Sequence, residues 1–241
     1  MIDTTSTMPA ASPAETHARE NRGLLARAEK RALIWLAERC PRCVHSDHLS
    51  ALGLLGMLGT GAAFAASGTY PAALPLVVVA LAVNWFGDSL DGTLARVRRQ
   101  QRPRYGYYVD HALDIAGTAF LFGGLAASGL MSTTLAVAVM AAYFAVMAEV
   151  FLATSSRGVF KMSFLGFGPT ELRIVLSLGA LALIRTTHVT IGGHGPFLLF
   201  DVGGVLGLAG LTFTFVASCV ANGRALYRAE PLEWHRPVPR N

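Results

Sequence analysis

The chain has 241 residues, of which 53% are hydrophobic and only 15% are charged, and its mean hydropathy is +0.46. This balance excludes a soluble domain with a charged surface and indicates an integral membrane protein. The formal net charge of +5 favours contact with anionic lipid headgroups, and no motif combining aromatic and basic residues indicates nucleic-acid binding.

The N-terminal region divides into a tail and a helix. Residues 1–22 are polar and contain proline, without the basic and apolar regions of a signal peptide, so we expect a disordered cytoplasmic tail that stays attached. Residues 23–44 place Leu24 and Leu33 on a face opposite Arg27. We expect an amphipathic helix that lies along the membrane interface; the alternative is a short helix packed on the membrane bundle.

Six apolar runs follow, each long enough to cross about 30 Å of hydrocarbon as a helix of roughly 20 residues. We therefore expect an all-α fold, a bundle of six transmembrane helices in one domain over residues 45–228, followed by a cytoplasmic tail over residues 229–241. The runs lie near residues 48–67, 72–95, 106–130, 133–154, 169–185 and 196–222.

The distribution of lysine and arginine predicts the orientation, because basic residues near short loops stay on the cytoplasmic side. Of the 20 basic residues, all but Arg185 fall on one side of the six-helix layout. We predict a multi-pass protein of the cell (inner) membrane, surrounded by membrane lipids, with both termini in the cytoplasm.

Four aspartates interrupt the second and third of these helices: Asp88, Asp91, Asp110 and Asp114. An ionised carboxylate at the centre of a spanning helix costs roughly 2.5 to 3.5 kcal/mol, so a group of four needs a compensating cation. Within each helix the two aspartates share a face, and the short loop makes the two helices antiparallel. The pairs are expected to meet at the cytoplasmic face and to hold one or two Mg²⁺, Mn²⁺ or Ca²⁺ ions, which suits phosphoryl transfer.

Small residues accompany the aspartates. Gly92, Ala95 and Gly106 lie at the cytoplasmic ends of the two helices, where a nucleotide ring could approach the backbone. The alternative is that they only let two helices pack, while Arg96 neutralises an aspartate within the protein. The combined spacing favours a binding site.

The order Asp-x2-Asp-Gly-x2-Ala-Arg, nine residues, Gly-x3-Asp-x3-Asp over residues 88–114 resembles the signature of the CDP-alcohol phosphatidyltransferase family at all eight defined positions. The resemblance implies an integral membrane enzyme of phospholipid synthesis that transfers a phosphate-bearing group from a CDP-linked lipid donor to an acceptor hydroxyl and releases CMP. It also implies two Mg²⁺ or Mn²⁺ ions as cofactors and a homodimer.

Roles for individual residues follow from the same resemblance. Asp88, Asp91 and Asp110 would hold the metal ions, and Asp114 would complete the metal site and act as the general base. The CDP moiety would contact Gly92, Ala95, Arg96 and Gly106, with Arg96 suited to phosphate by its fork of donors.

The chain departs from the family pattern at two places. Members often carry Pro-Asn-x-x-Thr before the first spanning helix to bind the nucleotide, where this chain has residues 46–50, Ser-Asp-His-Leu-Ser. Asp47 and Ser50 are candidates for the donor contact, or they are ordinary residues of a helix N-terminus. The loop before Gly106 lacks the Ser or Thr that relatives commonly place near the donor, and Arg102 or Arg104 is a candidate replacement.

An acceptor pocket is predicted from charged residues on the later helices. Acidic side chains in membrane-embedded segments indicate a polar pocket, which points to Glu149 and Glu171, although Glu171 also suits the positive end of a helix. A phosphorylated acceptor would need basic partners. The candidates are Arg157, Lys161 and Arg173.

The acceptor itself, a small polar alcohol or a lipid, stays open. The short chain favours CDP-diacylglycerol as the donor. The alternative is a CDP-choline or CDP-ethanolamine type of phosphotransferase acting on diacylglycerol. The pair Thr170-Glu171 is similar to a stretch found in those enzymes.

Other functions fit the sequence less well. A divalent-cation transporter needs polar groups across the whole membrane, whereas these acids cluster near one end. Membrane prenyltransferases are longer and divide their aspartate motifs between distant helices, and a structural protein would not need four aligned acids. A zinc site built from Cys40, Cys43, His45 and His48 is disfavoured, because this spacing is too compact to close around one ion.

Overall fold

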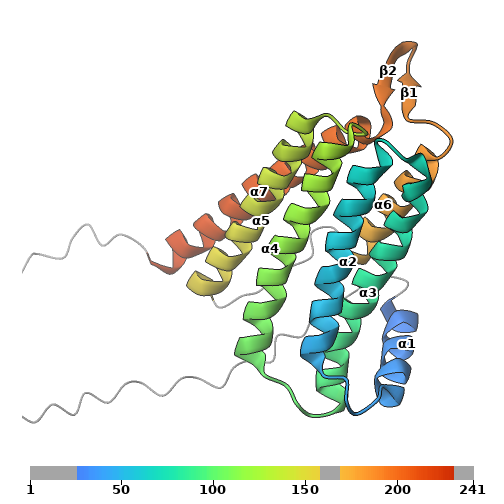
Figure 1. Ribbon diagram of the computed structural model, residues 1–241. Coiled ribbons are helices and arrows are strands. Elements are labelled where there is room, and N and C mark those ends of the chain that lie inside the picture. The colour runs from blue at the N-terminus through green and yellow to red at the C-terminus, as the bar shows by residue number, and fades with distance from the viewer. Residues whose placement is uncertain (1–25, 158–168, 231–241) are drawn as a thin grey trace, which may run out of the picture.

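A computed structural model describes residues 26–157 and 169–230 of the chain (Figure 1). These residues form helices joined by short connections, with one small β-hairpin between the last two helices. The elements are α1 (Ala26–Arg39), α2 (Ser46–Ser67), the 3₁₀ helix η1 (Pro71–Ala73), α3 (Leu74–Val97), α4 (Pro103–Ser128), α5 (Thr133–Arg157), α6 (Pro169–Leu183), β1 (His188–Ile191), β2 (His194–Leu198) and α7 (Leu199–Ala229).

Helices α2 to α7 follow the six predicted apolar runs in order, although α7 continues further, to Ala229. The protein is therefore mostly helical, and within residues 26–157 and 169–230 the all-α prediction misses the hairpin of β1 and β2. In that hairpin, His188 pairs with Leu198 in an antiparallel ladder. Gly192 and Gly193 between the strands have φ values of 57° and 82°, which a two-residue hairpin turn requires.

Four of the described helical segments are long and apolar enough to cross a membrane: α2, η1 with α3, α5 and α7. The protein is a multi-pass membrane protein. Helix α6 has 15 residues, which span about 22 Å, less than the roughly 30 Å of hydrocarbon. Helix α4 has 26 residues but carries Arg104, Asp110 and Asp114, which lower its hydropathy. The six-span layout therefore stays a prediction.

Helix α2 lies between α3 and α4 at separations that only glycine permits. A Cβ on Gly56 would lie 2.5 Å from the backbone nitrogen of Asn84 in α3. Toward α4, a Cβ on Gly61 would collide with the backbone of Phe120, and a Cβ on Gly124 would collide with the backbone of Gly61. These contacts fix the two aspartate-bearing helices on either side of α2.

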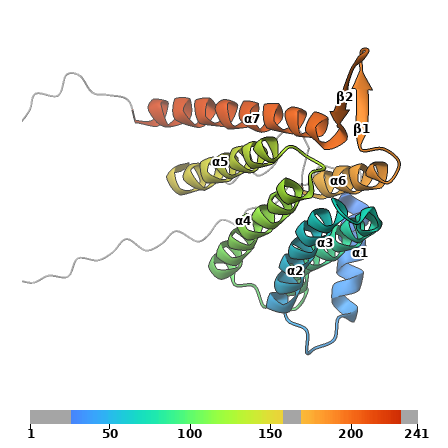
Figure 2. The ribbon, with the colours of Figure 1, turned by 45° about the horizontal axis from the view of Figure 1, so that its top comes forward.

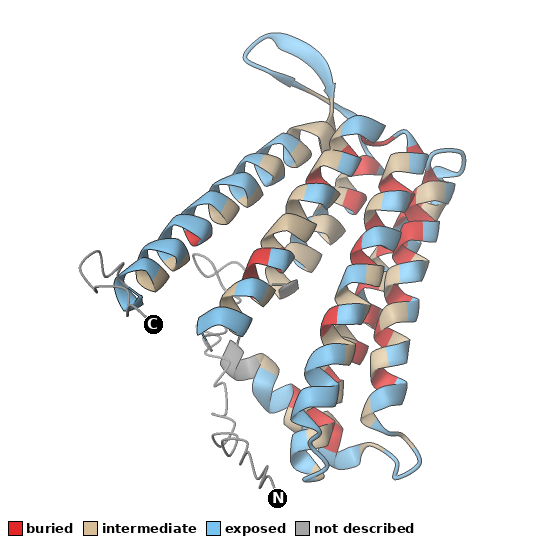
Figure 3. Cartoon of the chain, turned by 90° about the vertical axis from the view of Figure 1, so that its left-hand side faces the viewer, coloured by how far each residue is buried: buried red, intermediate tan, exposed pale blue. Residues whose placement is uncertain are grey.

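The largest apolar cluster lies toward the hairpin end of the bundle and joins α2 to α6. Phe64 and Val77 are fully buried in it, and Leu125 is 1% exposed. Figure 3 shows that buried residues concentrate in the helices around α2 and become rare in α7. Helix α7 lies against α5 at the edge of the bundle (Figure 2) and exposes Leu206 and Phe213, as expected for a lipid-facing helix.

Helix α1 packs against α3 near the end of the bundle that lies away from the hairpin (Figure 1). Its Leu33 and Ala37 are buried in a second apolar cluster with Leu90 of α3. The opposite face exposes Trp35, and the guanidinium of Arg39 lies 4.2 Å from the centre of the Trp35 ring. One face is therefore packed on protein, and the interfacial position of the other face stays a prediction.

The segment 40–48, considered above for zinc, is organised by an arginine. The guanidinium of Arg98 donates to three backbone carbonyls of this segment, including that of Val44 at 2.5 Å. The backbone N–H of His45 donates to Nδ1 of His48 at 3.2 Å at the start of α2. Over residues 26–157 and 169–230, no three Cys, His, Asp or Glu side chains are placed to hold a metal ion, so a zinc site gains no support.

Candidate active site

A single pocket between α2, α3, α4, α5 and α6 is lined by all four aspartates. Asp88 and Asp91 lie near the end of α3, and Asp110 and Asp114 lie in the first half of α4. Because α3 and α4 run antiparallel on the two sides of α2, their aspartate-bearing ends are adjacent. The chain thereby gathers four carboxylates that are separated by up to 26 positions in the sequence.

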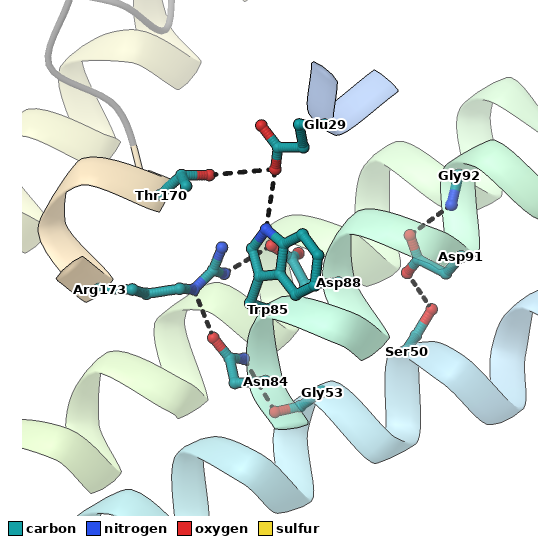
Figure 4. Close-up of polar contacts among 10 residues, drawn as sticks. All are labelled: Glu29, Ser50, Gly53, Asn84, Trp85, Asp88, Asp91, Gly92, Thr170 and Arg173. Atoms are coloured by element: carbon teal, nitrogen blue, oxygen red, sulfur yellow. Dashed lines mark hydrogen bonds and ion pairs between the residues drawn. The ribbon is translucent and has the colours of Figure 1, made fainter. Parts of the chain in front are cut away.

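Asp91 is held by donors from α2 and from its own backbone. Its Oδ2 accepts a hydrogen bond of 2.6 Å from the hydroxyl of Ser50, and its Oδ1 accepts one from the backbone N–H of Gly92 (Figure 4). The hydroxyl of Ser46 donates to the backbone carbonyl of Asp91 at 3.0 Å. Helix α2 therefore fixes both the backbone and the carboxylate of this aspartate.

Asp88 is held by a cation from α6. Nη2 of Arg173 donates to its Oδ2 at 2.6 Å, and Nε of the same guanidinium donates to Oδ1 of Asn84 at 2.7 Å (Figure 4). Asn84 is buried, and its Nδ2 donates to the backbone carbonyl of Gly53 at 2.9 Å. A continuous chain of hydrogen bonds thus runs from the backbone of α2 through α3 to α6 and back to Asp88.

The four carboxylates that line this pocket suit a hard divalent cation, because Mg²⁺ and Mn²⁺ prefer oxygen ligands such as carboxylates. In the part of the chain that the structure describes, however, no three acidic, His or Cys side chains converge closely enough to enclose one ion. The contacts of Asp88 and Asp91 give a physical reason, since both carboxylates are turned toward partners in the protein. A cation would need some of these side chains to turn.

The residues predicted to contact the donor nucleotide have different positions. Ser50 lines the aspartate pocket, whereas Asp47 is exposed and forms an ion pair with Arg102. The guanidinium of Arg96 donates to Oγ1 of Thr93 at 3.0 Å. The others, Gly92, Ala95 and Gly106, lie outside the lining of the pocket, and the space that a Cβ on Gly106 would take is open.

Of the predicted acceptor residues, Arg173 lines the aspartate pocket. Glu149 is buried against α7, where it accepts hydrogen bonds from Ser218 at 2.5 Å and from Asn222 at 2.6 Å. Arg157 donates to the side-chain oxygen of Asn222. Glu171 lies in the first turn of α6, and Lys161 falls outside the described residues.

The lining residues that were not predicted from the sequence include two with polar side chains near the aspartates, Asn84 and Tyr143. A signal for Asn84 was present, because it is a polar residue four positions before Asp88 in an apolar helix and so shares its face. Tyr143 belongs to α5, and no pattern in that apolar segment links it to the aspartates. Only the packing of α5 on α4 brings it to the pocket.

The fold is a membrane helix bundle with a carboxylate-lined pocket. The model of the CDP-alcohol phosphatidyltransferase family matches residues 47–216, and the chain belongs to this family of transferases of phospholipid biosynthesis. The resemblance drawn from the aspartate motif is therefore confirmed.

The fold is also similar to that of a solved enzyme. The crystal structure of Mycobacterium tuberculosis phosphatidylinositol phosphate synthase (PgsA1) with CDP-DAG bound superposes with a TM-score of 0.54 at 16% sequence identity, covering 88% of this chain and 99% of that chain. At this identity the likeness shows a shared fold. No curated protein matches the chain.

Proposed function

We propose that the protein transfers a phosphatidyl group from CDP-diacylglycerol to the hydroxyl of an acceptor and releases CMP. The observation that carries this proposal is the single pocket in which α3 and α4 present all four aspartates of the family motif, with Arg173 beside them. The similar fold of the synthase with CDP-DAG bound supports the choice of donor.

The roles that we propose for the aspartates are those that the resemblance to the family implies. When bound, Mg²⁺ or Mn²⁺ offsets the negative charge of the donor diphosphate. Asp88, Asp91 and Asp110 would hold these ions through their carboxylate oxygens. Asp114 completes the site and acts as the general base. It takes the proton from the acceptor hydroxyl while the oxygen of that hydroxyl bonds to the phosphorus of the phosphatidyl group. The bond from that phosphorus to the bridging oxygen breaks, and CMP leaves with the electron pair.

The donor contacts lie around the ends of α3 and α4. We assign Arg96 to the phosphates, since it is an exposed residue five positions after Asp91 in α3 and its guanidinium offers several donors. Gly92, Ala95 and Gly106 leave room for the nucleotide. Asp47 and Ser50 were further candidates, and the bond from Ser50 to Asp91 gives Ser50 a role in holding a metal-binding carboxylate.

We propose that the acceptor enters near α6, with Arg173 facing it in the pocket and Glu171, Lys161 and Arg157 as further candidates. The contacts of Glu149 with Ser218 and Asn222 favour a role in holding α7 against α5 instead. The basic residues at the end of the bundle opposite the hairpin support a cytoplasmic active site with both termini in the cytoplasm. A homodimer of the cell (inner) membrane is the assembly that the family suggests.

The test is a CMP-release assay with the purified full chain in detergent. CDP-diacylglycerol, Mn²⁺ or Mg²⁺ and a panel of acceptors (glycerol phosphate, inositol phosphate, serine) should give metal-dependent CMP in at least one combination. A second arm supplies CDP-choline or CDP-ethanolamine with diacylglycerol, and turnover only in that arm would replace the donor. If no combination releases CMP, while metal flux into proteoliposomes is observed, the protein is a transporter instead.

A further inference from the structure

The guanidinium of Arg173 binds a carboxylate, that of Asp88, which a divalent cation would also bind. Its guanidinium contacts Oδ2 of Asp88 at 2.6 Å, and the side chains of Arg173 and Asp88 are only 15% and 26% exposed. Partly buried charges are weakly screened by solvent, so the positive charge of Arg173 acts strongly on any second cation at this carboxylate.

We propose that Arg173 competes with the divalent cation for Asp88, and that Asn84 holds it in this competing position. This inference rests on the proposed function and adds a regulatory step to it. Cation binding displaces the guanidinium from Asp88, and the displaced arginine then faces the pocket with its donors available to a phosphate group.

The position of the arginine is set by Asn84. A free arginine side chain has many rotamers, and holding one of them costs conformational entropy. Asn84 is 7% exposed and is itself fixed by its bond to the carbonyl of Gly53. Its Oδ1 accepts from Nε of Arg173 at 2.7 Å, which leaves Nη2 directed at Asp88. The guanidinium is therefore pre-oriented by a buried side chain that carries no charge.

The contact of Ser50 with Asp91 differs from that of Arg173 with Asp88 in the charge of the hydrogen-bond donor. The Ser50 hydroxyl and the backbone N–H of Gly92 are neutral donors, and these two hydrogen bonds leave further lone pairs of Asp91 open to a cation. Arg173 adds a full positive charge and turns Asp88 toward α6. Among the described contacts of these two aspartates, the arginine is the one that opposes a cation electrostatically.

The release of Arg173 would link metal and phosphate binding. Arginine binds phosphate through two parallel hydrogen bonds, which requires a guanidinium free of its carboxylate partner. An ion at Asp88 frees the arginine, and a phosphate group on Arg173 removes its competition with the ion. Each ligand is therefore expected to strengthen the binding of the other, because such coupling is reciprocal.

The test measures Mn²⁺ binding to the full chain in detergent by the electron paramagnetic resonance signal of free Mn²⁺, with no substrate present. We expect Arg173→Gln to bind Mn²⁺ about tenfold or more tightly than the unmodified protein, since one nearby positive charge is removed. Arg173→Lys keeps the charge and should stay within about threefold of the unmodified affinity. Asn84→Ala keeps the arginine but loses its anchor, and should give an intermediate gain. Arg185→Gln, in the exposed turn after α6, should leave the affinity unchanged.

Two results would overturn the inference. Equal or weaker Mn²⁺ binding by Arg173→Gln would mean that the arginine orients Asp88 as a ligand, because loss of such an outer partner lowers metal affinity. An equal gain in Arg173→Lys and Arg173→Gln would mean that the charge is irrelevant. If Arg173→Gln does not fold, Asn84→Ala decides, and an affinity at or below that of the unmodified protein contradicts the proposal.

The experiment separates this inference from the proposed function. Asp91→Asn should weaken Mn²⁺ binding in the unmodified background and so locate the ion at the pocket. Mn²⁺ binding that responds to Arg173 as expected, without CMP release from any donor, supports the competition and rejects the transferase activity. Metal-dependent CMP release with no gain in Mn²⁺ affinity for Arg173→Gln supports the transferase and rejects the competition.

Discussion

The hydroxyl of Ser50 in α2 donates to Oδ2 of Asp91 in α3 at 2.6 Å. This contact joins the first membrane helix to a carboxylate of the family motif. It also shows what Ser50 contacts in the pocket, whereas the sequence suggested only a contact with the donor nucleotide or a position at the start of a helix. The bond is partly buried, so its loss leaves Asp91 less restrained at a point where the side chain faces the pocket.

Removal of this hydroxyl should weaken metal binding. We expect Ser50→Ala to raise the Mn²⁺ concentration for half-maximal CMP release by about tenfold, in line with other partners of metal-ligating carboxylates. The free energy of unfolding should fall by about 1 to 3 kcal/mol, because the bond is made to a charged group. Ser50→Thr retains the hydroxyl and should restore both values, and Ser155→Ala on the exposed part of α5 is the control. Unchanged metal dependence in Ser50→Ala would remove Ser50 from the site.

Asp114 is the proposed general base. Asp114→Asn keeps the size of the side chain but cannot accept the proton, so we expect CMP release to fall by about 100-fold or more. The protein should still insert and melt within a few degrees of the unmodified chain. Asp201→Asn is a suitable control, because Asp201 accepts a hydrogen bond from the backbone of Ser132 at the start of α5, away from the pocket. Full turnover by Asp114→Asn would reject the role as base.

Neighbouring glycines of α4 provide a matched test of the helix packing. A Cβ on Gly124 would collide with the backbone of Gly61, whereas nothing lies within 4 Å of a Cβ on Gly123. We expect Gly124→Ala to lower the free energy of unfolding by about 1 to 3 kcal/mol through overpacking. Gly123→Ala should be neutral, or stabilise by up to about 1 kcal/mol through helix propensity. Thermal melting in detergent measures both, and equal melting temperatures would contradict the close contact of α2 and α4.

Glu149 was predicted for the acceptor pocket, but its hydrogen bonds to α7 lead us to expect that its substitution affects stability. Because its carboxylate accepts from Ser218 and Asn222 of α7, Glu149→Leu leaves two donors without an acceptor. We expect a loss of about 1 to 3 kcal/mol in the free energy of unfolding, with the KM for the acceptor unchanged. Glu149→Gln retains one acceptor oxygen and should lose less. A raised acceptor KM in Glu149→Gln without any loss of stability would favour the pocket role instead.

The sequence alone predicted the elements that depend on local pattern. The apolar runs led to α2, α3 and α5, since a helix in lipid must satisfy its backbone internally over a length fixed by the bilayer. The spacing of Asp88 with Asp91, and of Asp110 with Asp114, set each pair on one helical face. The hairpin was missed although Gly192-Gly193 is a turn signal, because strands of four and five residues are too short to form an apolar run of membrane-spanning length.

Contacts between helices distant in the sequence were decided only by the tertiary structure. Nothing in the sequence indicated that Asn84 and Arg173, which are 89 positions apart, share a hydrogen bond, or that Glu149 turns toward α7. The periodicity of a helix determines which side chains share a face, and the packing of the whole bundle determines what that face meets. The sequence by itself therefore identified the four aspartates and the family, while the partners of Asp88 and Asp91 depended on how α2 and α6 pack against α3.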